Sequence, residues 1–197
     1  LAQEYGVSRI ALREATAALE SHGVIEIRHG SGIWVVKPLG DSTPIPDSEG
    51  GVLELIEARR ILESEVAALA AHLATTDDIA ELERLIVSMQ NPDYQKAEEA
   101  DRAFHHKLAD ITRNGALISL VEHLWEWRYQ LQSLHSLRIQ EAEFGNRERS
   151  AQHTTLLAAI KNHSPAGARK AMQIHLDEIQ EVVLNAFEAK AIESLRQ

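Results

Sequence analysis

Two kinds of hydrophobic pattern follow one another along this sequence. In the first 38 residues, one stretch of helical periodicity precedes two short β-branched runs at 24–28 and 33–36. From Val52 onward, apolar residues recur at the three- and four-residue spacing of amphipathic helices, with few turn signals between them. The sequence therefore predicts a small mixed segment followed by a long helical one.

The first segment has the outline of a winged helix-turn-helix. Gly6 is placed to end one helix, Ser8 to cap a second helix, and Gly23 to end that second helix. The two β-branched runs flank the glycine-rich residues 29–32, which are typical of a hairpin tip. In such a unit the second helix lies in the major groove of DNA and presents its N-terminal side chains to the bases.

Position on that second helix selects the candidate DNA contacts. Ser8, Arg9 and Arg13 occupy its first two turns, and the two arginines lie four residues apart on one face. An arginine can read guanine in bidentate fashion or hold a phosphate. His29, at the predicted wing tip, can approach the DNA backbone or minor groove. The alternative is that both arginines are ordinary solvated side chains.

Residues 39–51 separate the two segments. They are rich in Pro, Ser, Asp and Gly, and Pro44 and Pro46 lie two residues apart, which excludes a helix there. We therefore predict a domain over residues 1–38, a linker over 39–51 and a second domain over 52–197. The second domain is predicted to be an all-α bundle, so the chain is mainly α. Its helices are expected at 52–73, 77–90, 93–113, 115–138, 144–163 and 165–193.

Charge and composition narrow the function classes. The chain of 197 residues has 20 Lys and Arg against 30 Asp and Glu, a net charge of −10, which by itself argues against a nucleic-acid ligand. The first 38 residues are neutral, however, so all of the excess acidity belongs to residues 39–197. The absence of cysteine excludes disulfides, Cys-ligated metals and a thiol nucleophile. No apolar run is long enough to span a membrane and no leader is evident, so we expect a soluble, cytoplasmic protein without a membrane partner.

Four polar residues fall on inward faces of the predicted helices. Asp101 and His105 lie four residues apart, and His153 and His175 are each flanked by apolar residues at helical spacing. Three imidazoles and one carboxylate suit a divalent metal such as Zn, Ni or Mn and leave coordination positions open. The alternative is a hydrogen-bonded polar core without a metal.

Three further polar residues stay open at this stage. Arg59 falls on the apolar stripe of the first helix of the bundle, where a cation either extends to solvent or meets an anion inside. His123 and His135 are either surface residues or second contributors to the same interior.

The first segment resembles the DNA-binding domain of GntR-type bacterial regulators. The resemblance rests on two sequence motifs, Tyr5-Gly-Val-Ser-Arg-Ile-Ala-Leu-Arg-Glu-Ala and Leu19-Glu-Ser-His-Gly-Val-Ile-Glu-Ile-Arg-His-Gly-Ser-Gly. The resemblance implies DNA contacts by Ser8, Arg9, Arg13, His29 and Gly30. Ala11 stands where that family usually has proline. Leu1 falls where the family already has a preceding helix, so we expect a winged helix without its first helix.

The second segment resembles the FCD ligand-binding domain of the FadR branch of that family. The resemblance rests on the motifs Glu57-Ala-Arg-Arg-Ile-Leu-Glu, Asp101-Arg-Ala-Phe-His and Ala171-Met-Gln-Ile-His-Leu, together with His153. The resemblance implies that Asp101, His105, His153 and His175 bind the metal and that Arg59 clamps a small carboxylate effector. Gln152 stands where Glu is common, a change predicted to leave the metal site untouched.

These features lead to one hypothesis and two alternatives. The hypothesis is a cytoplasmic, homodimeric transcriptional regulator, acting as a repressor, whose metal-binding helical domain binds a small organic acid and thereby alters binding to a double-stranded DNA operator. It predicts that the protein is not an enzyme. The alternatives are a metal-dependent enzyme built on a helical bundle, and a dimerisation module with an incidental histidine core.

Overall fold

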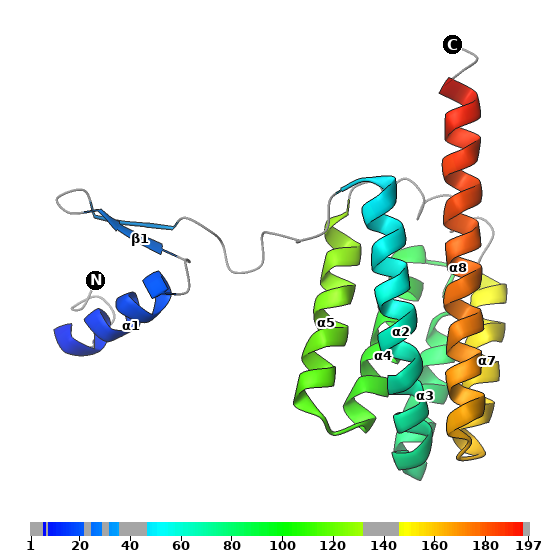
Figure 1. The fold of residues 1–197 in the computed structure, drawn as a ribbon. Coiled ribbons are helices and arrows are strands. Elements are labelled where there is room, and N and C mark those ends of the chain that lie inside the picture. Colours follow the sequence, from blue (N-terminus) through cyan, green and yellow to red (C-terminus); the bar gives the residue numbers. More distant parts are fainter. Residues whose placement is uncertain are drawn as a thin grey trace. The chain divides into compact units, whose positions relative to one another are not determined.

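The chain divides into two compact units, Leu1–Pro44 and Ile45–Gln197 (Figure 1). The computed structural model describes residues 6, 8–21, 25–28, 32–35, 47–131 and 146–194. Within these ranges the structure is mainly helical, which confirms the predicted fold class. The predicted domain limits at residues 38 and 51 stay predictions.

The N-terminal unit contains one helix and one hairpin. Helix α1 (Arg9–Ser21) follows Ser8, whose carbonyl accepts a hydrogen bond from the Leu12 N–H at 3.0 Å. Strand β1 (Ile25–Arg28) pairs antiparallel with β2 (Gly32–Val35). Glu20 accepts a hydrogen bond from the Ile27 N–H of β1 at 3.2 Å, so the end of α1 is tied to the hairpin. This order of helix and wing follows the prediction, whereas the predicted helix over residues 1–5 and the hairpin tip lie outside the described residues.

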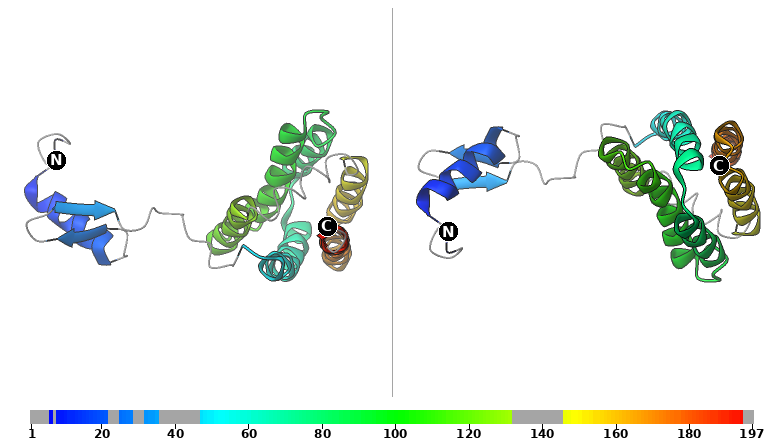
Figure 2. Two further views of the ribbon diagram at one scale, coloured as in Figure 1. Left: turned by 90° about the horizontal axis from the view of Figure 1, so that it is seen from above. Right: turned by 90° about the horizontal axis from the view of Figure 1, so that it is seen from below.

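The second unit is a bundle of helices, seen nearly end-on in Figure 2. Helix α8 is the longest and packs along both α2 and α7. The described helices of this unit are α2 (Glu49–Leu73), α3 (Thr76–Ser88), α4 (Tyr94–Ile111), α5 (Gly115–Gln130), α7 (Asn146–Lys161) and α8 (Pro165–Ser194).

Helix α2 begins three residues earlier than predicted. The side chain of Ser48 accepts a hydrogen bond from the Gly51 N–H at 3.2 Å, and Glu49 places a negative charge in the first turn. Both features stabilise a helix N-terminus. They outweigh the low helix propensity of the two glycines that made this stretch read as linker.

Helix α5 ends earlier than predicted. The expected helix ran to residue 138, but α5 ends at Gln130 and Leu131 has an extended backbone with ψ of 108°. Leu131 is fully buried and packs with Val52 and Leu55, so burial of this side chain coincides with the departure from helical geometry. Residues 132–145 lie outside the described residues.

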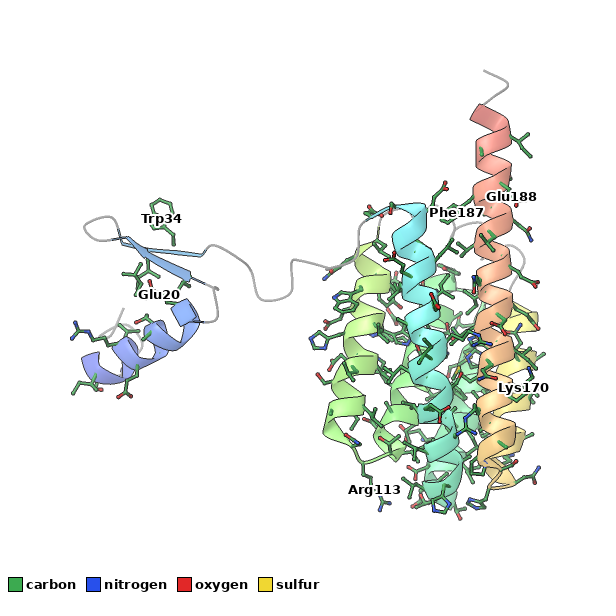
Figure 3. The ribbon with its side chains drawn as sticks, viewed as in Figure 1. Glu20, Trp34, Arg113, Lys170, Phe187 and Glu188 are labelled. Atoms are coloured by element: carbon green, nitrogen blue, oxygen red, sulfur yellow. The ribbon has the colours of Figure 1, made fainter. Side chains whose placement is uncertain are left out.

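The interior of the bundle combines two apolar clusters with buried polar side chains. One cluster of buried apolar side chains includes Phe104 and Trp125, and a second includes Val52, Val183 and Phe187, the last of which is labelled in Figure 3. The bundle also buries several charged and polar side chains: Arg59, Glu63, Glu98, Asp101, His105, His153 and His175. None of the described helices combines the length and apolar character that crossing a membrane requires.

Candidate functional site

The four predicted metal ligands lie together inside the bundle. Asp101 and His105 come from α4, His153 from α7 and His175 from α8, and all four are buried. His153 Nε2 lies 3.0 Å from Asp101 Oδ1 and 3.3 Å from His105 Nε2. One ring nitrogen from each histidine lies within 4.8 Å of the others. Residues separated by up to 74 positions in the sequence therefore face one point.

These separations suit a divalent metal. Zinc–nitrogen bonds of about 2.0–2.1 Å put two tetrahedral ligands roughly 3.4 Å apart. The 3.3 Å between His105 Nε2 and His153 Nε2 already matches that spacing. The remaining distances, up to 4.8 Å, need only small side-chain adjustments. The donor set of three imidazoles and one carboxylate suits first-row divalent metals.

Hydrogen bonds on the outer side of two rings fix which nitrogen faces the centre. His105 Nδ1 donates to Glu63 Oε2, and His175 Nδ1 donates to Gln152 Oε1 at 2.7 Å. In a neutral imidazole the other nitrogen then carries a lone pair. Both Nε2 atoms are thereby prepared as ligands, and the buried Nε2 of His175 has no hydrogen-bond partner among the described residues. Outer-sphere partners of this kind accompany most metal-bound histidines.

Burial favours the neutral form of two of these imidazoles, His105 and His175. Desolvation lowers the pKa of His105 and lowers the pKa of His175 well below its ordinary value, and the neighbouring His153 adds to the second shift. Burial alone would raise the pKa of Glu63, but the charge of Arg59 and the hydrogen bonds from His105 and Arg59 bring it well below its usual range. The neutral ring of His105 is therefore held by the ionised carboxylate of Glu63.

Arg59 lies inside the bundle beside this site. Its Nε donates to Glu63 Oε1 at 2.6 Å, and both side chains are almost fully buried. Its guanidinium lies 4.3 Å from the centroid of the Trp125 ring. Of the two readings of this cation, the structure therefore shows the one in which it meets an anion inside. Nη1 and Nη2 of Arg59 have no recorded acceptor among the described residues, so one edge of the guanidinium stays available.

The sequence reasoning missed three residues that complete the site. Glu63 lies four residues after Arg59 on the same inward face, a spacing that was visible in the sequence. Trp125 lies 5.0 Å from His105 between ring centroids, and its buried indole N–H has no acceptor among the described residues. Gln152 contacts His175 directly, and the prediction that its change from Glu leaves the metal ligands untouched stays a prediction. Nothing in the local sequence indicated that contact, since 23 residues separate the two.

Of the two histidines left open by the sequence, one is described by the structure. His123 is exposed on α5, where its Nδ1 lies 2.7 Å from the Ser119 carbonyl, so it does not reach the centre. His135, the other open candidate, lies outside the described residues.

The predicted DNA contacts are described in part. Ser8 and Arg13 are exposed at the N-terminal end of α1, where the prediction placed them. Arg9 is the first residue of α1, but its side chain lies outside what the structure describes, as do His29 and Gly30. The structure therefore supplies the helix that carries the arginines, and the wing-tip contacts stay a prediction.

Comparisons with known proteins agree with this architecture. Residues 1–35 match the family described as "Bacterial regulatory proteins, gntR family", and residues 54–178 match the FCD domain. The second match contains all four candidate metal ligands and Arg59. The structure also resembles Streptococcus agalactiae GntR, with a TM-score of 0.63 and 24% identity over 91% of this chain and 85% of that one, a similarity of fold.

Characterised relatives extend over both units. The chain is 34% identical to the "Uxu operon regulator" of Haemophilus influenzae, covering 98% of this chain and 73% of the relative. It is 31% identical to the "Uxu operon transcriptional regulator" of Escherichia coli, covering 93% of this chain and 76% of the relative. These relatives are transcriptional regulators, not enzymes. The chain belongs to the GntR family of bacterial transcriptional regulators and carries an FCD domain.

Proposed function

We propose that this regulator binds a divalent metal and a small carboxylate effector in its helical unit, and that the effector releases its operator DNA. In this proposal the protein is a homodimeric repressor. The metal ligands are Asp101, His105, His153 and His175, and the effector is held by the metal together with Arg59.

One observation carries the metal part of the proposal. His105 and His175 each use Nδ1 to donate outward, so their Nε2 lone pairs face the interior beside the carboxylate of Asp101. Lone pairs and a carboxylate that face one another in a buried site repel unless a cation or proton lies between them. A hydrogen-bonded core satisfies these groups less well, because the buried Nε2 of His175 stays without a partner among the described residues.

The residues of the site have distinct roles in this proposal. Asp101, His105, His153 and His175 hold the metal, which when bound supplies a Lewis-acidic centre with open positions for an oxygen ligand. Glu63 and Gln152 hold two of the rings in the required orientation. Burial excludes water, which strengthens the attraction between the site and an anion.

Two unused donors support an oxygen-rich anion as the effector. The free edge of Arg59 presents Nη1 and Nη2, the geometry that pairs with a carboxylate. The Trp125 indole N–H is fully buried and lies on the ring beneath the same guanidinium. A carboxylate with a neighbouring hydroxyl or keto oxygen satisfies both donors, so we propose a small hydroxy or keto acid.

The proposed DNA interface is the N-terminal unit. Ser8, Arg9 and Arg13 at the start of α1 contact base edges and phosphates, and His29 and Gly30 contact the duplex at the wing. A homodimer presents two such units to a two-fold symmetric operator, whose half-site spacing it selects. Exposed apolar side chains on α2 and α8, including Ile61, Ile174 and Val182, offer surface for such an association. Light scattering is expected to give twice the chain mass of 21.9 kDa.

A DNA-release titration tests the proposed function. Operator DNA is selected from random duplexes with the full chain, labelled, and followed by fluorescence anisotropy in the presence of Zn²⁺. We expect one or more acids from a panel of small hydroxy and keto acids to lower DNA affinity. Removal of the metal with a chelator is expected to abolish the effect. A carboxylate that binds the helical unit without changing DNA affinity contradicts the proposal.

A further inference from the structure

Glu63 is a single buried carboxylate that serves two different groups. Oε1 accepts a hydrogen bond from Arg59 Nε at 2.6 Å, and Oε2 accepts one from His105 Nδ1. The residue is 1% exposed, so water does not screen either contact. One oxygen thus faces the arginine side of the site and the other faces the histidine side.

A nearby ion pair shows that a carboxylate on this helix can instead use both oxygens for one arginine. Glu65, two residues further along α2, uses both oxygens for one arginine: Arg169 Nε at 2.6 Å and Arg169 Nη2 at 2.8 Å. Such fork-to-fork pairing uses the whole carboxylate on one partner. Glu63 instead leaves the Nη edge of Arg59 unused and leaves His105 Nε2 facing His153. The Nη atoms of Arg59 and the Nε2 atom of His105 therefore stay available to other ligands.

We infer that Glu63 couples the metal centre to the anion-binding edge of Arg59, so that occupancy of one changes affinity at the other. This inference rests on the proposed function, because it requires both a metal and an anion to bind in the bundle. Glu63 is a positioning residue in this role, since it touches neither ligand.

The direction of the coupling follows from the charges. An anion on the free edge of Arg59 compensates part of the guanidinium charge that polarises Glu63. The carboxylate then attracts the Nδ1–H of His105 more strongly, which makes Nε2 of that ring a better metal ligand. The anion is therefore expected to tighten metal binding, and by thermodynamic reciprocity the metal tightens anion binding by the same factor.

Zinc affinity alone tests this coupling, without the unidentified effector. Zn²⁺ dissociation constants are measured by competition with a chromophoric chelator for the full chain and for Glu63→Gln, Arg59→Gln and the double variant. Glutamine has one acceptor oxygen, so it cannot serve both donors, and we expect Glu63→Gln to weaken Zn²⁺ binding about tenfold. Arg59→Gln imitates compensation of the guanidinium and is expected to tighten Zn²⁺ binding by roughly fivefold. In the Glu63→Gln background the same arginine change is expected to have a much smaller effect.

Matched variants separate coupling from loss of structure. Glu65→Gln removes a carboxylate from an arginine pair on the same helix, outside the site, and is expected to leave Zn²⁺ affinity unchanged. The double variant removes both buried charges together, so it avoids leaving an uncompensated Arg59. If Glu63→Gln alone does not fold by circular dichroism, the comparison of Arg59→Gln with the double variant still reports the contribution of Glu63.

The outcomes that contradict the inference and the proposed function differ. Equal Zn²⁺ affinities for Arg59→Gln and the double variant show that Glu63 does not act on the metal and overturn the inference. An arginine effect of the same size in both backgrounds also overturns it, because Arg59 then acts only through its charge. If the unaltered chain binds Zn²⁺ no better than a His153→Ala variant, the proposed metal centre fails and the inference fails with it.

Discussion

The two units of this regulator place their candidate functional side chains in opposite ways. In the N-terminal unit, the candidate DNA contacts Ser8 and Arg13 are exposed, as is Trp34, which projects from the hairpin on the side away from α1 (Figure 3). In the helical unit, charged side chains are buried, among them Arg59, Glu63 and Asp101. The candidate functional side chains are therefore exposed in the small unit and buried in the bundle.

This difference is the one that the proposed function requires of the two units. Duplex DNA is contacted by side chains at the surface of a helix and wing. A small anion is recognised by polar groups that converge inside an apolar framework, where electrostatic interactions are stronger. The net charge of −10 follows the same division, because the first 38 residues are neutral and the excess acidity lies in residues 39–197.

The largest expected effect comes from removing a metal ligand inside the bundle. His153→Ala removes the nitrogen that lies closest to Asp101, and we expect Zn²⁺ affinity to fall by more than about 100-fold, beyond the loss typical of outer-sphere changes. His123→Ala, which removes an exposed imidazole from α5, is the matched control. Chelator competition measures both, and equal affinities would show that the buried histidines form only a hydrogen-bonded core.

A change in the small unit is expected to alter DNA binding alone. Arg13→Ala removes an exposed cation from the predicted recognition helix and should cost about 1–3 kcal/mol of binding to selected operator DNA. Arg84→Ala on α3, also exposed, should leave DNA affinity unchanged. Anisotropy titrations at fixed salt measure the two variants. An equally large loss of DNA affinity for Arg84→Ala would contradict the assignment of DNA binding to the small unit.

Trp125→Phe tests whether the indole N–H of Trp125 contributes to binding of the proposed carboxylate effector. The substitution keeps an aromatic ring beneath Arg59 and removes the N–H that lacks an acceptor among the described residues. We expect roughly tenfold weaker binding of the releasing carboxylate, the contribution of one hydrogen bond to a charged group. Zn²⁺ affinity should stay the same. Calorimetry of both ligands checks this, and unchanged carboxylate affinity would remove Trp125 from the effector site.

The buried histidines predict a pH dependence of stability in chelator-treated protein. Burial lowers the pKa of His105 and His175 in the folded chain, whereas the unfolded chain takes up their protons near pH 6.5. The unfolded state therefore binds more protons below that pH, and the free energy of unfolding should fall as pH decreases from 7 to 5. Each imidazole contributes about 1.4 kcal/mol per pH unit at most. Urea titrations measure the slope, and His175→Gln should reduce it; a slope unaffected by that change would contradict neutral burial.

The smallest expected effect concerns an ion pair on the outside of the bundle. Glu65→Gln breaks the exposed pair with Arg169 and should cost less than about 1 kcal/mol of unfolding free energy. Glu63→Gln, two residues away, leaves a buried Arg59 uncompensated and should cost about 3 kcal/mol or more. Thermal or urea unfolding compares the two, and similar losses would show that burial does not distinguish them.

Most of the fold was predictable because it depends on local periodicity. The helical spacing of apolar residues and the caps located most of the helices, and the β-branched runs located both strands. The errors occurred at element ends. The Ser48 cap begins α2 before Gly50 and Gly51, and α5 ends where Leu131 is buried in an extended conformation; neither feature follows from periodicity.

By itself the sequence determined the candidate ligands, because an inward helical position is a property of spacing within one helix. Asp101, His105, His153 and His175 could each be placed on an inward face without knowing what lies opposite. Only the tertiary structure decided what each ligand and Arg59 meet: Glu63 beside His105, Gln152 beside His175, and Trp125 beneath Arg59. These contacts join different helices, and the distance between side chains on separate helices is set by packing rather than by their separation along the chain.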